Sequence, residues 1–289
     1  MKRLVCLSAI VFIAGNSFAQ SNSTVKNTDT VKVGNFIIIK KNKGAAASEN
    51  NGSSRNKPIE YRMERRTRKK NNISTNWWIM DLGFANITDN TNYATAQAGS
   101  YFKIVRPADG PVTQNSYKLN TGKSSNVNIW LFMQKLNVIK HIVNVKYGFG
   151  IEMYNFRYDT RLSTRKDPAP YVFNDSISFT KNKLYVSYLT VPIMLNINTT
   201  PDSRRGFSFS MGVSAGYLYG NRNKQISNER GKQKIAGDFN FEPWRFAAIG
   251  EVGIGPIRLY GTYSLNRLQK EVTRVEQYPY AVGLRFSNW

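Results

Sequence analysis

Apolar and polar residues alternate along most of the chain from Asn76 onward, as they do in β-strands whose two faces meet different surroundings. Between residues 141 and 158, large apolar residues occupy the odd positions from Val143 to Met153, while asparagine, lysine, glycine and glutamate occupy the even positions. The alternation recurs along the chain, less cleanly in three of the segments. It predicts strands at 77–87, 126–136, 141–158, 184–197, 206–220, 244–254, 257–266 and 277–286.

The nature of the two faces distinguishes a membrane barrel from a soluble one. One face of each clear strand is large and apolar, whereas the other carries glycine, alanine, serine, asparagine and isolated charges. Lipid requires continuous apolar cover, and a narrow lumen accommodates small and polar groups. An open sheet would leave unpaired backbone groups in lipid, so the sheet must close. The pattern predicts an all-β fold, an eight-stranded antiparallel up-and-down transmembrane β-barrel at residues 76–289.

The strand predicted at 126–136 does not fit a regular alternation. Trp130 and Phe132 share parity with Asn126 and Asn128, so a strictly alternating strand would place large and polar side chains on one face. A β-bulge would resolve the conflict, and the faces of this strand stay unassigned.

Long and short connections alternate between the predicted strands. Those at 88–125, 159–183, 221–243 and 267–276 are long, whereas those at 137–140, 198–205 and 255–256 are short. This arrangement places all long loops at one end of a barrel and all turns at the other. Because outer-membrane barrels keep their turns in the periplasm, we expect extracellular loops and both termini in the periplasm.

The start of the chain has the layout of a secretory signal peptide, predicted at residues 1–19. Lys2 and Arg3 precede an uncharged apolar run at 4–14, and small residues at Ser17 and Ala19 favour cleavage before Gln20. Cys6 lies inside the apolar run rather than at its end, which disfavours a lipoprotein. Cleavage therefore removes the sole cysteine.

Composition excludes several other classes of protein. The chain is 41% hydrophobic, too much for a disordered protein, yet no run of about eighteen apolar residues remains after signal cleavage. A helical membrane protein is thereby excluded. One cysteine and one histidine also exclude a disulfide scaffold and a zinc ribbon.

Residues 20–75 read as a basic, mostly disordered periplasmic arm with one strand-like stretch at 31–39. The whole chain carries a net charge of +23, and export excludes nucleic acid as the partner of this charge. Two interpretations stay open: the arm binds an anionic surface, or its charges keep it solvated and extended. The arm contains a basic cluster formed by Arg62, Arg65, Arg66, Arg68, Lys69 and Lys70.

Isolated charged residues share parity with the small residues of the predicted strands, so we expect them in the lumen. Single charges inside a narrow barrel are costly unless they are paired, which predicts a salt-bridge network that fills the core. The functional alternative is a gated ion path. The predicted lumen charges are Asp81, Lys146, Glu152, Glu251, Arg258 and Arg285.

Nothing in the sequence pattern supports catalysis. Gly122-Lys123-Ser124 is similar to part of a phosphate loop, but Tyr117 occupies the position of the first glycine and a strand follows. His141 begins a strand at the turn end, the wrong side of the membrane for an outer-leaflet enzyme. Since no cluster has metal-ligand spacing, we expect neither a metal nor a cofactor. The loop serines without a histidine partner are Ser176, Ser178 and Ser227.

Aromatic residues near the predicted strand ends fit the belts that barrels carry at both membrane interfaces. Isolated aromatics also occur at strand ends in other β-proteins, so they support a membrane barrel only modestly. The candidates are Trp77, Trp78, Trp244, Tyr278 and Tyr280.

Three segments carry a resemblance to a known family. Residues 188–195 match an aromatic-Leu-x-aliphatic-Pro-aliphatic strand, 119–127 match a Gly-Lys-Ser-x-Asn segment entering the second strand, and 81–84 match the first strand. Through them the chain resembles the PorT-like outer-membrane β-barrel proteins of Bacteroidota-type bacteria, and its architecture is similar to the OmpX and OmpA transmembrane barrels. The resemblance implies fold and location more than activity. Phe286 is in register with the lipid face, as expected for a last strand, whereas Trp289 is out of phase.

We therefore expect a non-enzymatic integral protein of the bacterial outer membrane, with a side-chain-filled lumen and long extracellular loops that serve surface or envelope interactions. The alternatives are a small channel or a transport- or secretion-associated component, an outer-leaflet enzyme, and a soluble lipid-carrying barrel. The expected partners are outer-membrane lipid, lipopolysaccharide and an extracellular or periplasmic protein, the last through the loops or the arm. We expect no nucleic acid and a monomeric barrel.

Overall fold

The computed structural model describes residues 71–201, 206–254 and 256–287 in full, and the backbone of residues 30–33, 36–40 and 61–65. The chain divides into two compact units, residues 1–70 and 71–289. The signal peptide predicted at 1–19, the side chains of the basic cluster at 62–70 and Trp289 lie outside this description.

The first unit contains a small antiparallel sheet. Its strands β1 (Thr30–Val33), β2 (Phe36–Lys40) and β3 (Tyr61–Arg65) are arranged in the order β1-β2-β3. Val33 pairs with Phe36, so the stretch at 31–39 contains a two-stranded hairpin rather than one strand. The segment that we expected to be mostly disordered thus includes three short strands, and the next strand already begins within it, at Ile73.

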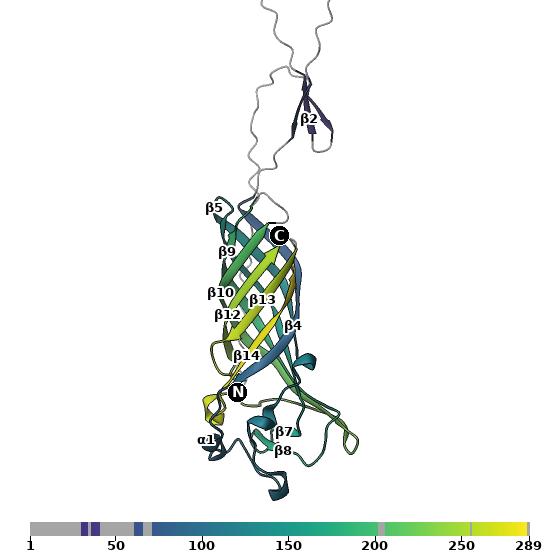
Figure 1. Cartoon of the computed structure of the whole chain (residues 1–289), viewed down its shortest axis with the longest axis vertical. Coiled ribbons are helices and arrows are strands. Elements are labelled where there is room, and N and C mark those ends of the chain that lie inside the picture. Colours follow the sequence, from purple (N-terminus) through teal and green to yellow (C-terminus); the bar gives the residue numbers. More distant parts are fainter. Residues whose placement is uncertain are drawn as a thin grey trace, which may run out of the picture. The chain divides into compact units, whose positions relative to one another are not determined.

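Eight long antiparallel strands of the second unit form a closed ring (Figure 1). Each pairs with the next strand of the ring along the chain, and the last pairs with the first, with Phe286 opposite Met80. The predicted eight-stranded up-and-down barrel is confirmed. The strands are β4 (Ile73–Asp89), β5 (Ser125–Ile139), β6 (Val143–Tyr158), β9 (Lys181–Asn198), β10 (Phe207–Ser227), β12 (Trp244–Ile254), β13 (Ile257–Ser264) and β14 (Gln277–Phe286).

The remaining elements lie in the long connections, and we call the end of the barrel that carries them the loop end (Figure 1). Within the described ranges, no helix is long and apolar enough to cross a membrane. The connection predicted at 159–183 contains the paired strands β7 (Leu162–Arg165) and β8 (Tyr171–Asn174). In the connection predicted at 221–243, β10 continues to Ser227 and pairs with β11 (Gly231–Ala236). The additional elements are α1 (Tyr93–Gln97), β7 (Leu162–Arg165), β8 (Tyr171–Asn174), β11 (Gly231–Ala236) and the short 3-10 helices Pro107–Asp109, Gln114–Tyr117, Thr121–Lys123 and Glu271–Thr273.

The barrel presents its large apolar residues outward and its polar residues inward. On β4, Leu82 and Phe84 are 45% and 62% exposed, whereas Asp81 between Met80 and Leu82 is fully buried. Alternate residues of a strand point to opposite faces, so this difference repeats around the ring over the part of the strands nearer the turn end. The predicted orientation of the two faces is confirmed, and it is the orientation that lipid requires.

A bulge sets the faces of β5, as the parity conflict indicated. The register shifts between Trp130 and Phe132 relative to β6. Trp130 is therefore fully buried inside the barrel, while Phe132 lies on the outward face and packs against Trp77, with ring centroids 5.9 Å apart. Without the bulge, the rings of Trp130 and Phe132 would both point into the lumen.

Candidate functional site

The centre of the lumen is an ion network built around Arg285 on β14. Its Nε and Nη2 atoms donate to the two carboxylate oxygens of Asp81 on β4, at 2.7 and 2.8 Å. Its Nη1 atom donates to Oε2 of Glu251 on β12, at 2.7 Å. The guanidinium also lies over the ring of Trp130, 5.2 Å from its centroid. Arg285 thus joins two carboxylates through bidentate and single charge-assisted hydrogen bonds.

Two further cations complete this network. Lys146 on β6 donates to Oε1 of Glu251, and Arg258 Nη1 on β13 donates to the same oxygen at 3.3 Å. Ser208 Oγ accepts from Arg258 Nη1 at 2.7 Å, and the amide of Asn128 and the indole of Trp130 both donate to Asp81. Strands from all sides of the ring therefore contribute to one network, which ties the barrel wall together across its interior.

A second buried ion pair lies closer to the loop end. Arg245 Nη1 on β12 donates to Oε2 of Glu152 on β6 at 2.7 Å, and its Nε donates to Ser264 Oγ at 2.8 Å. The rings of Tyr154 and Tyr188 lie 4.9 and 5.9 Å from the guanidinium carbon. Arg245 was missing from the predicted lumen charges, although it shares parity with Glu251 six residues later, because the strand at 244–254 is apolar on both faces in places.

All six predicted lumen charges lie inside the barrel, and each takes part in a buried ion pair. Their side chains and that of Arg245 are no more than 5% exposed. Four cations face three carboxylates at this level of the lumen, and all seven side chains are buried. Among the described residues, the network therefore fills the centre of the lumen with buried side chains.

The polarity of the two strand faces inverts toward the loop end. On β6, the inward side chains change from Lys146 and Glu152 to the buried aromatics Tyr154, Phe156 and Tyr158. The outward side chains change over the same distance from apolar residues to asparagine and arginine. On β9 the outward positions nearest the loop end are lysines, whereas Leu184 and Val186 point inward and are buried. The strands thus form a membrane-type wall over one part of their length and a water-exposed domain with an apolar core over the other.

All four long connections contribute to this apolar core. Tyr101 and Tyr117 come from the first connection, Leu162 and Val172 from the second. Phe239 and Phe241 follow from the third, and Leu268 and Val275 from the fourth. The loops therefore pack together as a cap over the loop end, instead of extending freely.

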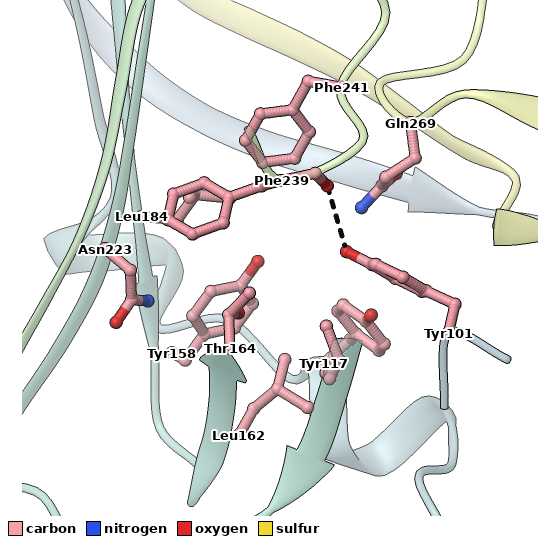
Figure 2. A pocket seen from close by; sticks show the side chains of 11 residues that line it. Tyr101, Tyr117, Tyr158, Leu162, Thr164, Leu184, Asn223, Phe239, Phe241 and Gln269 are labelled. Carbon is pink, nitrogen blue, oxygen red and sulfur yellow. Dashed lines mark hydrogen bonds between the residues drawn. The ribbon is translucent and has the colours of Figure 1, made fainter. Parts of the chain in front are cut away.

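The cap contains a small cavity, which Figure 2 shows with its lining side chains. Its volume of about 20 Å³ holds a water-sized molecule and is far below that of a drug-sized pocket. Burial raises the pKa of Tyr117 well above its ordinary value, so this lining phenol stays protonated. In the described part of the chain, buried Tyr117 Oη, Asn223 Oδ1 and Gln269 Oε1 have no hydrogen-bond partner. These three polar groups line the cavity, which belongs to the cap and is too small for an organic substrate.

A buried carboxylate connects two of the capping segments. Asp175, which follows β8, accepts from Arg230 Nη1 and Nη2 in the β10–β11 turn, at 2.6 and 3.3 Å. It also accepts from Ser163 Oγ on β7 at 3.2 Å. Burial opposes ionisation, but the hydrogen bonds from Arg230 and the Ile177 amide outweigh it and lower the pKa of Asp175. The ionised carboxylate therefore holds the second and third connections together.

We expect D175N to reduce the stability of the cap by about 1–3 kcal/mol at neutral pH, because an amide cannot replace the carboxylate that accepts from Arg230. Folding lowers the pKa of Asp175. Its contribution to the stability of the wild-type cap is therefore present above the unfolded pKa near 4, and it disappears as the pH falls through the folded pKa. Limited proteolysis of the folded protein in detergent should show faster cleavage within 160–180 and 228–243. E229Q, an exposed neighbour in the same turn, is the control. Equal cleavage of D175N and wild type would contradict this role.

The other candidate residues of the sequence do not form a reaction centre. His141 lies in the tight β5–β6 turn with a φ of 58°, at the end of the barrel opposite the cap. Ser176 accepts from Arg106 Nη2, and buried Ser227 accepts from the backbone of Arg230 at 3.1 Å. Gly122 and Lys123 lie in a three-residue 3-10 helix. Among the residues described, no group of three histidine, cysteine, aspartate or glutamate side chains could hold a metal ion.

The aromatic residues proposed for the interfacial belts lie on the outward face in two groups. Trp77 and Trp78 are 65% and 72% exposed and lie toward the turn end. Two aromatic pairs lie toward the loop end. The ring centroids of Trp244 and Tyr217 are 5.1 Å apart, and those of Tyr280 and Tyr263 are 6.5 Å apart. Tyr278 is half-buried on the same face of β14 as Tyr280.

The closed ring, the apolar outward face and the ion-filled interior define a transmembrane β-barrel of the outer-membrane type. A family model described as an outer membrane protein beta-barrel domain matches residues 84–269, and the chain belongs to this family. A search of the curated proteins finds no match. The family places the protein in the bacterial outer membrane.

Proposed function

We propose that this protein is a closed, non-enzymatic outer-membrane barrel whose loop-end cap serves as a binding platform outside the cell. The observation that carries the proposal is the combination of a lumen closed by ion pairs with loops packed into one core. A transport pore needs an open interior, and this interior is filled at the level of Arg285. A surface that binds a partner gains from loops held in one conformation, because less entropy is lost on binding.

The orientation of the platform is part of the proposal. It is supported by the contrast between the long, structured connections at the loop end and the tight turns at the other end. Outer-membrane barrels place such turns in the periplasm. A signal peptide at 1–19 and a basic periplasmic arm, predicted from the sequence, agree with this orientation. Within the family we propose the PorT-like subfamily, since its aromatic-Leu-x-aliphatic-Pro pattern falls within β9.

Cysteine labelling of intact cells tests the orientation, because cleavage before Gln20 would leave a chain without cysteine. V272C introduces a thiol at a 66% exposed loop position, and K140C introduces one in the β5–β6 turn. A membrane-impermeant maleimide should label V272C in intact cells and K140C only after the outer membrane is opened. Labelling of K140C but not V272C in intact cells would refute the proposal.

Planar bilayers test the closed lumen with the same purified protein. We expect no stable conductance steps from the wild type, because the buried side chains of the network fill the lumen. A reproducible large conductance would favour the small channel instead. An effect of deleting residues 20–70, which leaves β4 whole, on partner binding would transfer the binding role from the loops to the arm.

A further inference from the structure

Positive charges are aligned across four neighbouring strands at the loop end. Arg157 on β6 pairs with Lys183 on β9, Lys183 pairs with Lys224 on β10, and Lys224 pairs with Lys234 on β11. Directly paired residues of neighbouring strands point to the same face and lie close together. We call these four residues and their outward neighbours the basic wall, which comprises Arg157, Lys181, Lys183, Arg222, Lys224, Lys232 and Lys234.

Like charges opposite one another destabilise a sheet, so this alignment has a cost that folding alone does not explain. Burial, followed by the repulsion of neighbouring cations such as Lys181 and Arg222, holds the pKa of Lys183 below its ordinary value. Across the described part of the molecule, no aspartate or glutamate forms an ion pair with any member of the wall. The wall therefore presents a concentrated positive charge that an external anion would stabilise.

The wall begins directly where the apolar outer surface ends. On β10, Tyr217 and Tyr219 are exposed, and a register shift between Leu218 and Gly220 brings Arg222 and Lys224 to the same side of the strand. The guanidinium of Arg222 lies over the ring of Tyr185 on β9, 5.4 Å from its centroid. Tyrosines mark the interface of a membrane, so the cations lie at the level of the lipid headgroups. A peptide or polysaccharide in solution would not require this position next to the aromatic belt.

We infer that the basic wall binds the phosphate groups of a phosphorylated glycolipid in the outer leaflet. Neighbouring strands are about 4.8 Å apart, so one phosphate between two strands can accept hydrogen bonds from two cations of the row. A headgroup with two phosphates would span the row from β6 to β11. The inference rests on the proposed orientation, which places the basic wall at the outer leaflet. It adds a defined partner and a defined site to the platform.

Binding of a purified bisphosphorylated lipid A to the folded full-length protein in neutral detergent tests the inference. K183Q/K224Q/K234Q removes three charges of the row, and K103Q/K166Q/K270Q removes the same charge from loop positions outside the wall. We expect the wall variant to bind at least about tenfold more weakly and the control variant to stay within about twofold of wild type. Heat-modifiable gel mobility verifies that both variants are folded.

Enzymatically dephosphorylated lipid A separates phosphate recognition from adsorption of acyl chains. Wild type should bind it no better than the wall variant does. Equal binding of wild type and wall variant to the phosphorylated lipid, or full binding of the dephosphorylated lipid, would overturn the inference. Preference of the wall for an anionic polysaccharide over lipid A would overturn it as well. Because the measurement is made in micelles, its failure leaves the orientation test by cysteine labelling unaffected.

Discussion

Replacing Arg285 with methionine is expected to lower the free energy of unfolding of the barrel by about 3–5 kcal/mol. Arg285 is fully buried and supplies two of the hydrogen bonds to Asp81 and one to Glu251. In R285M, Asp81 keeps only the neutral donors Asn128 and Trp130, so a charge stays buried without a counter-charge. Urea unfolding in micelles, followed by tryptophan fluorescence and by heat-modifiable mobility, measures the loss.

The double variant D81N/R285M is the control for this prediction. It removes the buried carboxylate together with its partner, and Glu251 retains Lys146 and Arg258. We expect it to recover more than half of the stability lost in R285M, since the cost of an unpaired buried charge exceeds the net worth of the pair. A double variant less stable than R285M would contradict this expectation. It would show that the hydrogen-bond geometry of the pair contributes more to barrel stability than its charges do.

A methyl group added at Gly150 is expected to destabilise the barrel by about 1–3 kcal/mol or to prevent its assembly. Gly150 on β6 faces Trp130, and a Cβ atom there would lie 2.6 Å from the carbonyl oxygen of Ile129 and 2.8 Å from Cε3 of Trp130. The indole cannot retreat easily, because it donates to Asp81 and lies beneath Arg285. G150A therefore forces a shift in the network or in the backbone.

Gly250 on β12 provides a matched control within the same ring. A Cβ atom at Gly250 would meet its nearest neighbour, the carbonyl oxygen of Ser210, at 3.9 Å. We expect G250A to be neutral or to stabilise by up to about 1 kcal/mol, because alanine loses less backbone entropy than glycine in a strand. Comparable urea midpoints for G150A and G250A would show that the lumen around Trp130 is loosely packed.

The inversion of strand polarity explains how one chain satisfies two solvents. Where lipid surrounds the barrel, apolar residues point outward and charged residues pair inside. Beyond the loop-side tyrosines, polar headgroups and water surround the same strands, so Tyr154, Phe156 and Leu184 turn inward and lysines outward. The position of the inversion marks the end of the hydrophobic band on β6 and β9, and the cap, the cavity and the basic wall all lie beyond it.

The sequence alone determined the number of barrel strands, their order along the chain and the faces of the regular ones. This was feasible because alternate residues of a strand must point to opposite sides, so a period of two records which side meets lipid. The six predicted lumen charges followed from the same parity. Two features that break the regular pattern were harder: the sequence indicated the bulge near Trp130 without assigning faces, and Arg245 was hidden in a strand with apolar residues on both sides.

The tertiary structure decided which charges meet and what the loops build. Asp81 and Arg285 are 204 positions apart in the chain, and only the closure of β14 on β4 brings them together. Register between strands likewise decides three features at the loop end. They are the extension of β10, the common core of the four connections, and the row from Arg157 to Lys234. Periodicity specifies the direction of a side chain along its own strand, whereas register between distant segments specifies its neighbours.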